Sequence, residues 1–286
     1  MACGNAYWDG NVTLSAVILL ALAGLLSGVM AGFLGIGGGT LLVPVLIQMN
    51  FLPVPITFSP VQATATSSLA ILVTSGAGSF QNWRMGYLQL KQIFFLGAPA
   101  LVTAFVGTMV GDRIPDHWLL IGFGLLLLSN LYLVSLKKRV IRKAQFRESR
   151  MGIGPAINPV LARLFTGSIA GFMAGLFGVG GGVILVPLQI LLLGERIKSA
   201  VRTSLGVIVI TSLSACTGHA INQNINWLAG LILGVGGLLG VQFSTRFLPR
   251  LSNETVTQLF RGLLIVLSIY IFFQAWQTYG MALAIL

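Results

Sequence analysis

The chain has little charge and very little acid. Asp, Glu, Lys and Arg together make up 8% of its 286 residues, and 6 of those residues are acidic. A soluble domain carries roughly 25% charged residues, because charge covers the surface that faces water. The acidic residues are Asp9, Asp112, Asp116, Glu148, Glu195 and Glu254. All of them fall at the ends of apolar segments or between them, so a carboxylate proton relay through a membrane has little support.

The chain is also poor in cysteine and histidine, with 2 of each. Their positions form neither a disulfide framework nor a cluster at metal-ligand spacing. No Ser-His-Asp arrangement and no pair of carboxylates occurs within an apolar segment. Gly35 and Gly37 resemble part of a dinucleotide-binding fingerprint, but that motif requires a soluble βαβ unit around it. The sequence therefore predicts no enzyme, no metal site and no cofactor.

Long apolar runs make up most of the chain. Apolar residues are 56% of the total, and the mean hydropathy is +0.92. Several runs approach or exceed the roughly 20 residues that span a bilayer as a helix. The first run, from Val12 to Leu34, has no basic segment before it and is too long for the apolar core of a signal peptide. We expect a retained first span and a multi-pass membrane protein.

A glycine-rich segment occurs twice in the chain, 143 positions apart and without a gap. Gly28, Gly32, Gly35, Gly37, Gly38, Gly39 and Pro44 are matched by Gly171, Gly175, Gly178, Gly180, Gly181, Gly182 and Pro187. The similarity continues at a spacing of 137, where Thr66 and Ser67 match Thr203 and Ser204. Chance rarely places this many glycines in register. The pattern indicates a duplicated unit.

Each copy of the unit contains five apolar segments. They lie at 12–34, 38–50, 61–80, 91–111 and 117–136 in the first half, and at 160–177, 182–194, 200–219, 227–246 and 255–277 in the second. We expect a first transmembrane repeat at 1–136, a basic connector at 137–159 and a second transmembrane repeat at 160–286. Because five is an odd number of crossings, the second repeat enters the membrane from the opposite side. The predicted fold class is an all-α polytopic membrane protein with two inverted-topology repeats.

The distribution of basic residues agrees with this topology. If the 137–159 connector is cytoplasmic and every segment crosses, all Lys and Arg except Arg113 lie on the cytoplasmic side, and both termini lie outside. Merging each glycine-broken pair into one span would instead move Arg196, Lys198 and Arg202 outside, or give both repeats the same orientation. The net charge of +11 thus reflects topology rather than a basic face for nucleic acid. The polybasic connector could also attract anionic membrane lipids.

The segments that follow the glycines, 38–50 and 182–194, are shorter than the others. At 1.5 Å per residue each reaches about 20 Å, less than the roughly 30 Å hydrocarbon core, so we expect short helices that begin at membrane depth. Glycine leaves backbone amides uncovered, and the first amides of a helix lack partners within it. The helix N-terminus also carries partial positive charge. Two such ends, one from each repeat, would form an anion site near the midplane.

The predicted substrate-binding residues follow from this geometry. They are Gly37, Gly38, Gly39, Thr40, Thr66, Ser67, Gly180, Gly181, Gly182, Val183, Thr203 and Ser204, with Gln48, Gln62 and Arg202 as additional members. Backbone amides and the hydroxyls of Ser and Thr would bind an oxyanion. The alternative is that the glycines only allow helices to pack closely, and that the hydroxyls only bond carbonyls of their own helices.

Five polar residues near the segment ends have two interpretations each. Gln48 and Gln62 could line a pathway or make hydrogen bonds between helices. Arg202 could draw anions toward the site or fix the topology at the interface. Asp112 and His219 could exchange protons or simply be solvated at the interface.

The paired motifs resemble a known family. AGFLGIGGGTLLVP (Ala31 to Pro44) and AGLFGVGGGVILVP (Ala174 to Pro187), each followed by a Thr-Ser motif, resemble the sulfite exporter TauE/SafE family over essentially the whole chain. Gly86-Tyr87 and Asn226-Trp227 fit the loop before that family's fourth helix, although residues 222–226 lack charge. The resemblance implies transport of sulfite, sulfoacetate and related organosulfonates across the plasma (inner) membrane, with substrate and direction differing between members.

We therefore expect a secondary transporter that moves small sulfur-containing anions by alternating access. An inside-negative potential of about 100 mV favours anion exit by about 2.3 kcal/mol per charge. Export thus needs no coupled ion, whereas uptake would need H⁺ or Na⁺. An anion channel, an ion-coupled importer and a non-transporting membrane scaffold remain alternatives, and a homodimer remains open.

Overall fold

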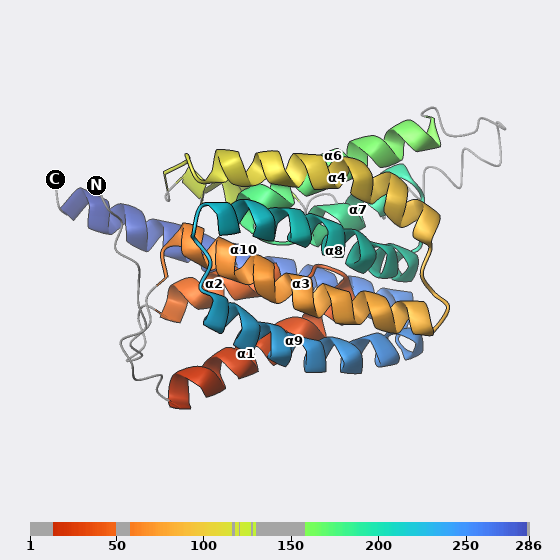
Figure 1. The fold of residues 1–286 in the computed structure, drawn as a ribbon, viewed down its shortest axis with the longest axis horizontal. Coiled ribbons are helices and arrows are strands. Elements are labelled where there is room, and N and C mark those ends of the chain that lie inside the picture. Colours follow the sequence, from red (N-terminus) through yellow and green to blue (C-terminus); the bar gives the residue numbers. More distant parts are fainter. Residues whose placement is uncertain are drawn as a thin grey trace.

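The computed structural model describes residues 14–49, 58–115, 118–119, 121–126, 128–129 and 158–284. Every regular element within these ranges is helical, which confirms the predicted all-α class (Figure 1). The α-helices are α1 (Leu14–Leu34), α2 (Gly39–Gln48), α3 (Pro60–Arg84), α4 (Leu90–Gly111), α6 (Pro159–Phe177), α7 (Gly182–Leu192), α8 (Ile197–Ile221), α9 (Trp227–Phe247) and α10 (Asn253–Ala284). A 3-10 turn, η2 (Leu248–Arg250), joins α9 to α10. The predicted connector lies outside the described residues except at 158–159, and the predicted 117–136 segment is described in part.

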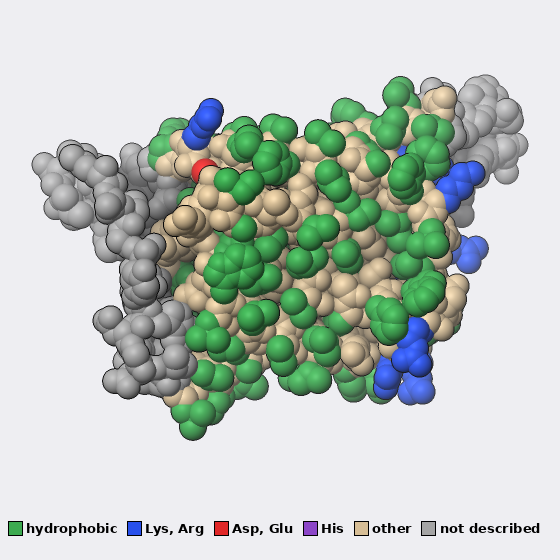
Figure 2. All heavy atoms as spheres, in the orientation of Figure 1, with side chains coloured by type: hydrophobic (Ala, Val, Ile, Leu, Met, Phe, Trp, Pro, Cys, Tyr) green, Lys and Arg blue, Asp and Glu red, His purple; other side chains and the backbone are tan. Residues whose placement is uncertain are grey.

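Five of the described helices are long and apolar enough to cross a membrane. These candidate spans are Leu14–Leu34, Leu90–Gly111, Val160–Phe177, Ile197–Ile221 and Trp227–Arg250. Helix α3 is 25 residues long but less apolar, because its buried face carries several Ser and Thr side chains. Figure 2 shows hydrophobic side chains over the face between the two ends of the molecule, with Lys and Arg mainly at one end. Exposed apolar side chains in such a band suit contact with lipid tails.

The two short helices begin directly after glycines, as predicted. Helix α2 has 10 residues and α7 has 11. Gly37 and Gly38 have φ angles of 75° and 81°, and Gly180 and Gly181 have φ angles of 72° and 76°. Only glycine adopts this left-handed region without steric cost. The repeated glycines therefore set where each short helix starts.

Contacts between the two halves of the sequence dominate the packing. Helix α1 lies along α9, and α4 lies along α6. A Cβ atom added to Gly28 would collide with the carbonyl oxygen of Gly237, and one added to Gly175 would collide with that of Ala104. The same close approach occurs at Gly107, Gly236 and Gly240. Small residues bring these backbones together, as in other helix pairs within membranes.

The order of contacts gives the relative directions of the central helices. Leu69 and Val73 of α3 meet Gly230 and Gly234 of α9 in the same order, so α3 and α9 are parallel. Helices α4 and α8 are parallel by the same criterion, with Ile93 against Gly206 and Gly97 against Ile210. The chain reverses direction between α3 and α4 (Figure 1). Helices α3 and α8 therefore run in opposite directions.

The two ends of this helix bundle differ in charge. At one end, the Arg202 guanidinium lies over the Tyr87 ring, and Lys198 Nζ donates a hydrogen bond to the Pro249 carbonyl at 3.0 Å. We call this the basic end; it holds the C-termini of α3 and α9 and the N-termini of α4 and α8. The opposite end holds Asp112, at the C-terminus of α4, and His219, in the last turn of α8. We call it the Asp112 end.

Candidate functional site

The two glycine loops, Gly35 to Gly38 and Gly178 to Gly181, meet inside the protein. A Cβ atom added to Gly39, the first residue of α2, would lie 2.5 Å from the carbonyl oxygen of Gly178. A Cβ atom added to Gly182, the first residue of α7, would collide with the carbonyl oxygen of Gly35. Each short helix therefore starts against the loop of the other half. The structure brings together the glycines of the predicted site.

Serine side chains join each loop to the opposite half of the chain. Ser67 Oγ of α3 donates to the Gly178 carbonyl at 2.9 Å, and Ser204 Oγ of α8 donates to the Gly35 carbonyl at 2.7 Å. Each hydroxyl also lies within hydrogen-bond distance of a carbonyl one turn earlier in its own helix, Thr64 at 2.9 Å and Val201 at 2.8 Å. Both hydroxyls are therefore engaged with backbone carbonyls in this conformation, and their direct contact with an anion stays a prediction.

The first amides of both short helices are unpaired. The N–H groups of Leu41 and Leu42 donate to the Gly38 carbonyl, and those of Ile184 and Leu185 donate to the Gly181 carbonyl. Within the described ranges, no hydrogen bond is donated by the amides of residues 37–40 or 180–183. These residues are buried. Unpaired amides at two adjacent helix N-termini are the arrangement that binds anions elsewhere in proteins.

The threonines of the predicted site have separate surroundings. Thr40 is 0% exposed, and its hydroxyl has no hydrogen-bond partner among the residues that the structure describes. The Thr66 hydroxyl accepts the Asn226 amide at 3.1 Å, at the start of α9. The Thr203 hydroxyl donates to Gln92 Oε1 at 3.4 Å, near the basic end. Thr66 and Thr203 therefore contact neighbouring helices rather than the glycine loops.

The three additional polar residues lie apart from the loops. Gln48 accepts a hydrogen bond from the Tyr270 hydroxyl at 2.7 Å, which links α2 to α10. The side chain of Gln62 caps the start of α3 by accepting the amide of Ser59 at 3.2 Å. The Arg202 guanidinium lies 3.6 Å from the centroid of the Tyr87 ring at the basic end. The structure does not bring these three together with the glycines.

Two buried isoleucines that sequence reasoning missed lie against both glycine loops. A Cβ atom on Gly37 would be 3.0 Å from Ile208 Cγ2 and 3.2 Å from Ile71 Cγ2, and one on Gly180 would be 3.1 Å from each. Both isoleucines are 0% exposed. Their spacing of 137 is that of the Thr-Ser repeat, and this register was the one signal that could have identified them. We call Ile71 and Ile208 the isoleucine pair.

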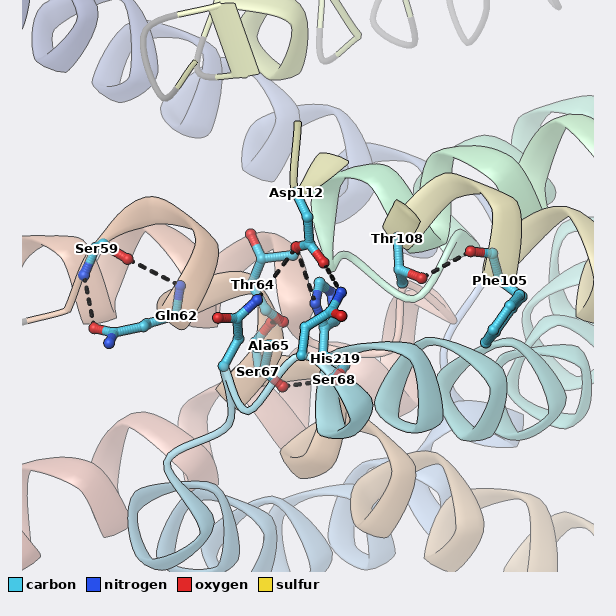
Figure 3. A network of polar contacts seen from close by, with 12 residues as sticks. Ser59, Gln62, Thr64, Ala65, Ser67, Ser68, Phe105, Thr108, Asp112 and His219 are labelled. Carbon is cyan, nitrogen blue, oxygen red and sulfur yellow. Dashed lines mark hydrogen bonds and ion pairs between the residues drawn. The ribbon is translucent and has the colours of Figure 1, made fainter. Parts of the chain in front are cut away.

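A second polar cluster lies at the Asp112 end (Figure 3). His219 Nδ1 is 3.6 Å from Asp112 Oδ1, and the side-chain amides of Asn222 and Asn224 both donate to the Asp112 carboxylate. His219 is 2% exposed, so solvation at an interface does not describe its surroundings. Burial raises the pKa of Asp112, but His219 and the two asparagine amides lower it more, and the net pKa is below the usual value.

Comparisons with known proteins agree with the resemblance. A family model described as sulfite exporter TauE/SafE matches residues 20–271. The chain is 26% identical over 272 residues to the probable membrane transporter protein YunE of Bacillus subtilis, covering 90% of this chain and 97% of that protein. It is 30% identical over 205 residues to the probable membrane transporter protein MJ0441 of Methanocaldococcus jannaschii, covering 70% and 71%. No solved structure matches the chain.

Proposed function

The chain belongs to the sulfite exporter TauE/SafE family and is a membrane transporter, and from this premise we propose that it moves small sulfur-containing anions across the plasma membrane by alternating access. The observation that carries the proposal is the meeting of two buried helix N-termini whose first amides lack partners. A sulfonate or sulfite group presents several oxygens that accept hydrogen bonds. Backbone amides bind such a group without a Lys or Arg at the centre of the membrane.

The two halves act as inverted repeats in this proposal. Its support is that α3 and α8, which occupy equivalent places in the two halves, run in opposite directions. The crossed hydrogen bonds from Ser67 to Gly178 and from Ser204 to Gly35 are equivalent under the same repeat. In such transporters the substrate site lies at the interface of the repeats, and rocking of one repeat against the other exposes it to each side in turn.

The isoleucine pair closes the site in the conformation described. Ile71 and Ile208 both lie against Gly37 and Gly180. An anion that reaches the amides must displace these side chains. The crossed serine bonds keep the loops together at the same time. Alternating access therefore requires that one helix, α3 or α8, shift away from the loop of the other half.

Export is the direction that the membrane potential supports. With the basic end in the cytoplasm, as the charge distribution favours, the anion leaves toward the Asp112 end. An inside-negative potential of about 100 mV assists this step by about 2.3 kcal/mol for each net negative charge that moves outward. Arg202 and Lys198 at the basic end would then raise the local concentration of anions on the cytoplasmic side.

The proposal is tested by counterflow in liposomes. Purified protein is reconstituted into vesicles loaded with unlabelled sulfite or sulfoacetate, and entry of the labelled anion is measured. We expect saturable entry that depends on internal substrate, competed by thiosulfate or sulfoacetate more than by zwitterionic taurine. Flux that never saturates and shows no counterflow would indicate a channel. No flux of any sulfur-containing anion would contradict the proposal.

Glycine variants test the location of the site. Gly38→Ala and Gly181→Ala place a methyl group at the start of each short helix, against Ser27 Oγ and the Ala170 carbonyl oxygen respectively, at positions with φ of 81° and 76°. Gly86→Ala and Gly194→Ala impose a similar backbone strain, with φ of 72° and 68°, but nothing lies within 4 Å of the new methyl group. We expect loss of flux in the first pair and retained flux in the second. Unchanged flux in folded Gly38→Ala and Gly181→Ala proteins would exclude this site.

A further inference from the structure

The repeat register continues through the turns that follow α3 and α8. The Tyr87 amide donates to the Asn82 carbonyl at 3.0 Å, and the Asn224 amide donates to the His219 carbonyl at 3.1 Å. Each pair of equivalent positions is separated by 137 residues, as in the Thr-Ser repeat. Asn82 and His219 therefore occupy equivalent positions, one near the basic end and the other at the Asp112 end.

Both positions hold a buried polar side chain without a hydrogen-bond partner. Asn82 is 0% exposed and His219 is 2% exposed. Among the described residues, Asn82 Nδ2 and Oδ1 and both ring nitrogens of His219 lack a hydrogen bond. A buried polar group that bonds nothing is costly, so each such group in a native protein needs an explanation, of which a chemical role is one. The two positions differ in chemistry, since the imidazole can bind a proton and the amide cannot.

The carboxylate beside His219 is held in its ionised form. Side-chain amides of Asn222 and Asn224 donate to Asp112, with Asn224 Nδ2 at 3.3 Å from Oδ1. Asp112 is 16% exposed on its side chain, so water reaches it. A proton that arrives from water therefore finds an ionised carboxylate in front of a buried imidazole. The His219 ring is the group that gains the positive charge. The amides of Asn222 and Asn224 stabilise the ionised Asp112 carboxylate, whereas among the described residues no donor bonds the ring.

Few other charges face this pair. At the Asp112 end, Arg113 follows Asp112 directly in the chain. Several helices pack against α8, and their charged residues lie in the portions of those helices toward the basic end. On the described parts of these helices, the charged residues are Arg84, Lys91, Arg163, Glu254 and Arg261. Two further titratable groups are the Cys216 thiol on α8 itself and the Tyr270 hydroxyl of α10, which donates to Gln48. Asp112 is the acidic partner that the geometry assigns to His219.

We infer that Asp112 and His219 form the binding site for a proton whose movement is coupled to that of the anion. The inference rests on the proposed transport function and names its coupling ion. The proton adds to a ring nitrogen of His219, and the resulting imidazolium donates through Nδ1 to the Asp112 carboxylate. Helix α8 also carries Ser204 and Ile208, which contact the glycine loops. A change of charge at the end of α8 can therefore shift the same helix that closes the anion site.

The test uses full-length protein in liposomes with sulfoacetate, whose sulfonate stays ionised at all the pH values used. Valinomycin with equal potassium on both sides removes the membrane potential, and a pH gradient is then imposed. We expect the wild-type protein to accumulate labelled sulfoacetate against its own gradient for one sign of the pH gradient. Counterflow without any response to the pH gradient would overturn the coupling while leaving the transport proposal intact. Absence of counterflow would instead count against the transport function itself.

The variant His219→Asn assigns the coupling to this pair. It introduces the side chain that the equivalent buried position, Asn82, already holds, so it fits the fold. We expect counterflow to persist and accumulation driven by the pH gradient to disappear, and the same for Asp112→Asn. Wild-type accumulation in both variants would overturn the assignment.

Nuclear magnetic resonance detects protonation of the His219 ring directly, so this measurement does not require that a variant still transports. The chain has 2 histidines, so selective labelling gives two imidazole signals, and His117→Asn assigns the remaining one to His219. We expect the His219 ring to bind a proton over the pH range in which the gradient drives accumulation, and Asp112→Asn to weaken this binding because the neighbouring negative charge is lost. A ring that stays neutral throughout this range would overturn the inference.

Discussion

Ser204 Oγ donates a hydrogen bond to the carbonyl oxygen of Gly35 at 2.7 Å, across 169 positions of sequence. The equivalent bond from Ser67 to Gly178 joins the other helix to the other loop. Each loop is thus held by a helix from the opposite half of the chain. The two halves together form one candidate site that neither could build alone.

Removing a crossed serine bond should destabilise the protein. Ser67→Ala or Ser204→Ala leaves a buried loop carbonyl without this donor, at a cost of about 1–3 kcal/mol. Ser75→Ala is the matched control, because Ser75 Oγ donates to the Ile71 carbonyl within its own helix at 2.6 Å. Thermal unfolding in detergent should show a clearly larger loss for the two loop serines. Equal losses for all three variants would mean that the crossed bonds add nothing to stability.

Opening the isoleucine pair should let the anion leak. Ile71→Ala with Ile208→Ala removes apolar volume beside both glycine loops, so the site should no longer close between cycles. We expect efflux from loaded liposomes to become faster and less dependent on external substrate. Ile93→Ala, at an isoleucine of α4 that packs against Gly206, is the control for lost volume alone. Each truncation also costs about 2–5 kcal/mol of stability, so efflux is compared at a temperature where all variants remain folded. Equal leak in the control would exclude a closing role.

Among the residues that the structure describes, one non-glycine residue, Gln223, has an unfavourable backbone conformation that can be relieved. Gln223 has a φ of 55°, and the equivalent position in the first half is Gly86, with a φ of 72°. A left-handed conformation costs a residue with a Cβ about 1–2 kcal/mol, and the extra entropy of glycine in the unfolded chain offsets part of this. Gln223→Gly should therefore raise stability by about 0.5–1 kcal/mol. The reverse change, Gly86→Gln, should lower it, and thermal unfolding of both variants checks the pair.

The Asp112 cluster should make stability depend on pH. The pKa of Asp112 is lowered in the folded protein, so its stabilising effect is fully present above the unfolded pKa of about 3.9 and is lost as the pH falls through the folded pKa. Asp112→Asn should be less stable than the wild type at pH 7, and the difference should shrink below about pH 4. Denaturation of both proteins across this range is the measurement. A difference that stays constant down to the lowest pH would show that the carboxylate charge is not responsible.

The sequence predicted the backbone of the candidate site better than its side chains. Gly37, Gly38, Gly180 and Gly181 pointed to two irregular loops before short helices, because only glycine adopts positive φ angles at no cost. It also placed Ser67 and Ser204 in the site, where their contact with an anion stays a prediction, but it did not show that both bond loop carbonyls of the other half. The hydrogen-bond partner of a hydroxyl can be predicted only when the acceptors near it are known. Here the acceptor comes from a distant part of the chain.

The isoleucine pair and the contact between Asp112 and His219 show the limit of sequence-based prediction more clearly. Ile71 and Ile208 are apolar residues in an apolar chain, so nothing in their identity separated them from residues that face lipid. Asp112 and His219 were noted as two residues at the ends of different segments, with no indication that they meet. Contacts of this kind depend on which helices pack together, and helix packing in membranes follows shape and small residues rather than local pattern.

Composition, glycine register and charge distribution alone determined that this chain is a helical membrane protein of duplicated sequence and where its short helices begin. These properties are local, since hydropathy and backbone freedom belong to each segment by itself. Only the tertiary structure decided that each glycine loop is held by a serine of the opposite half, that two isoleucines lie against both loops, and that His219 is buried beside Asp112. Such pairings arise when helices distant in sequence pack closely enough for one side chain to reach another.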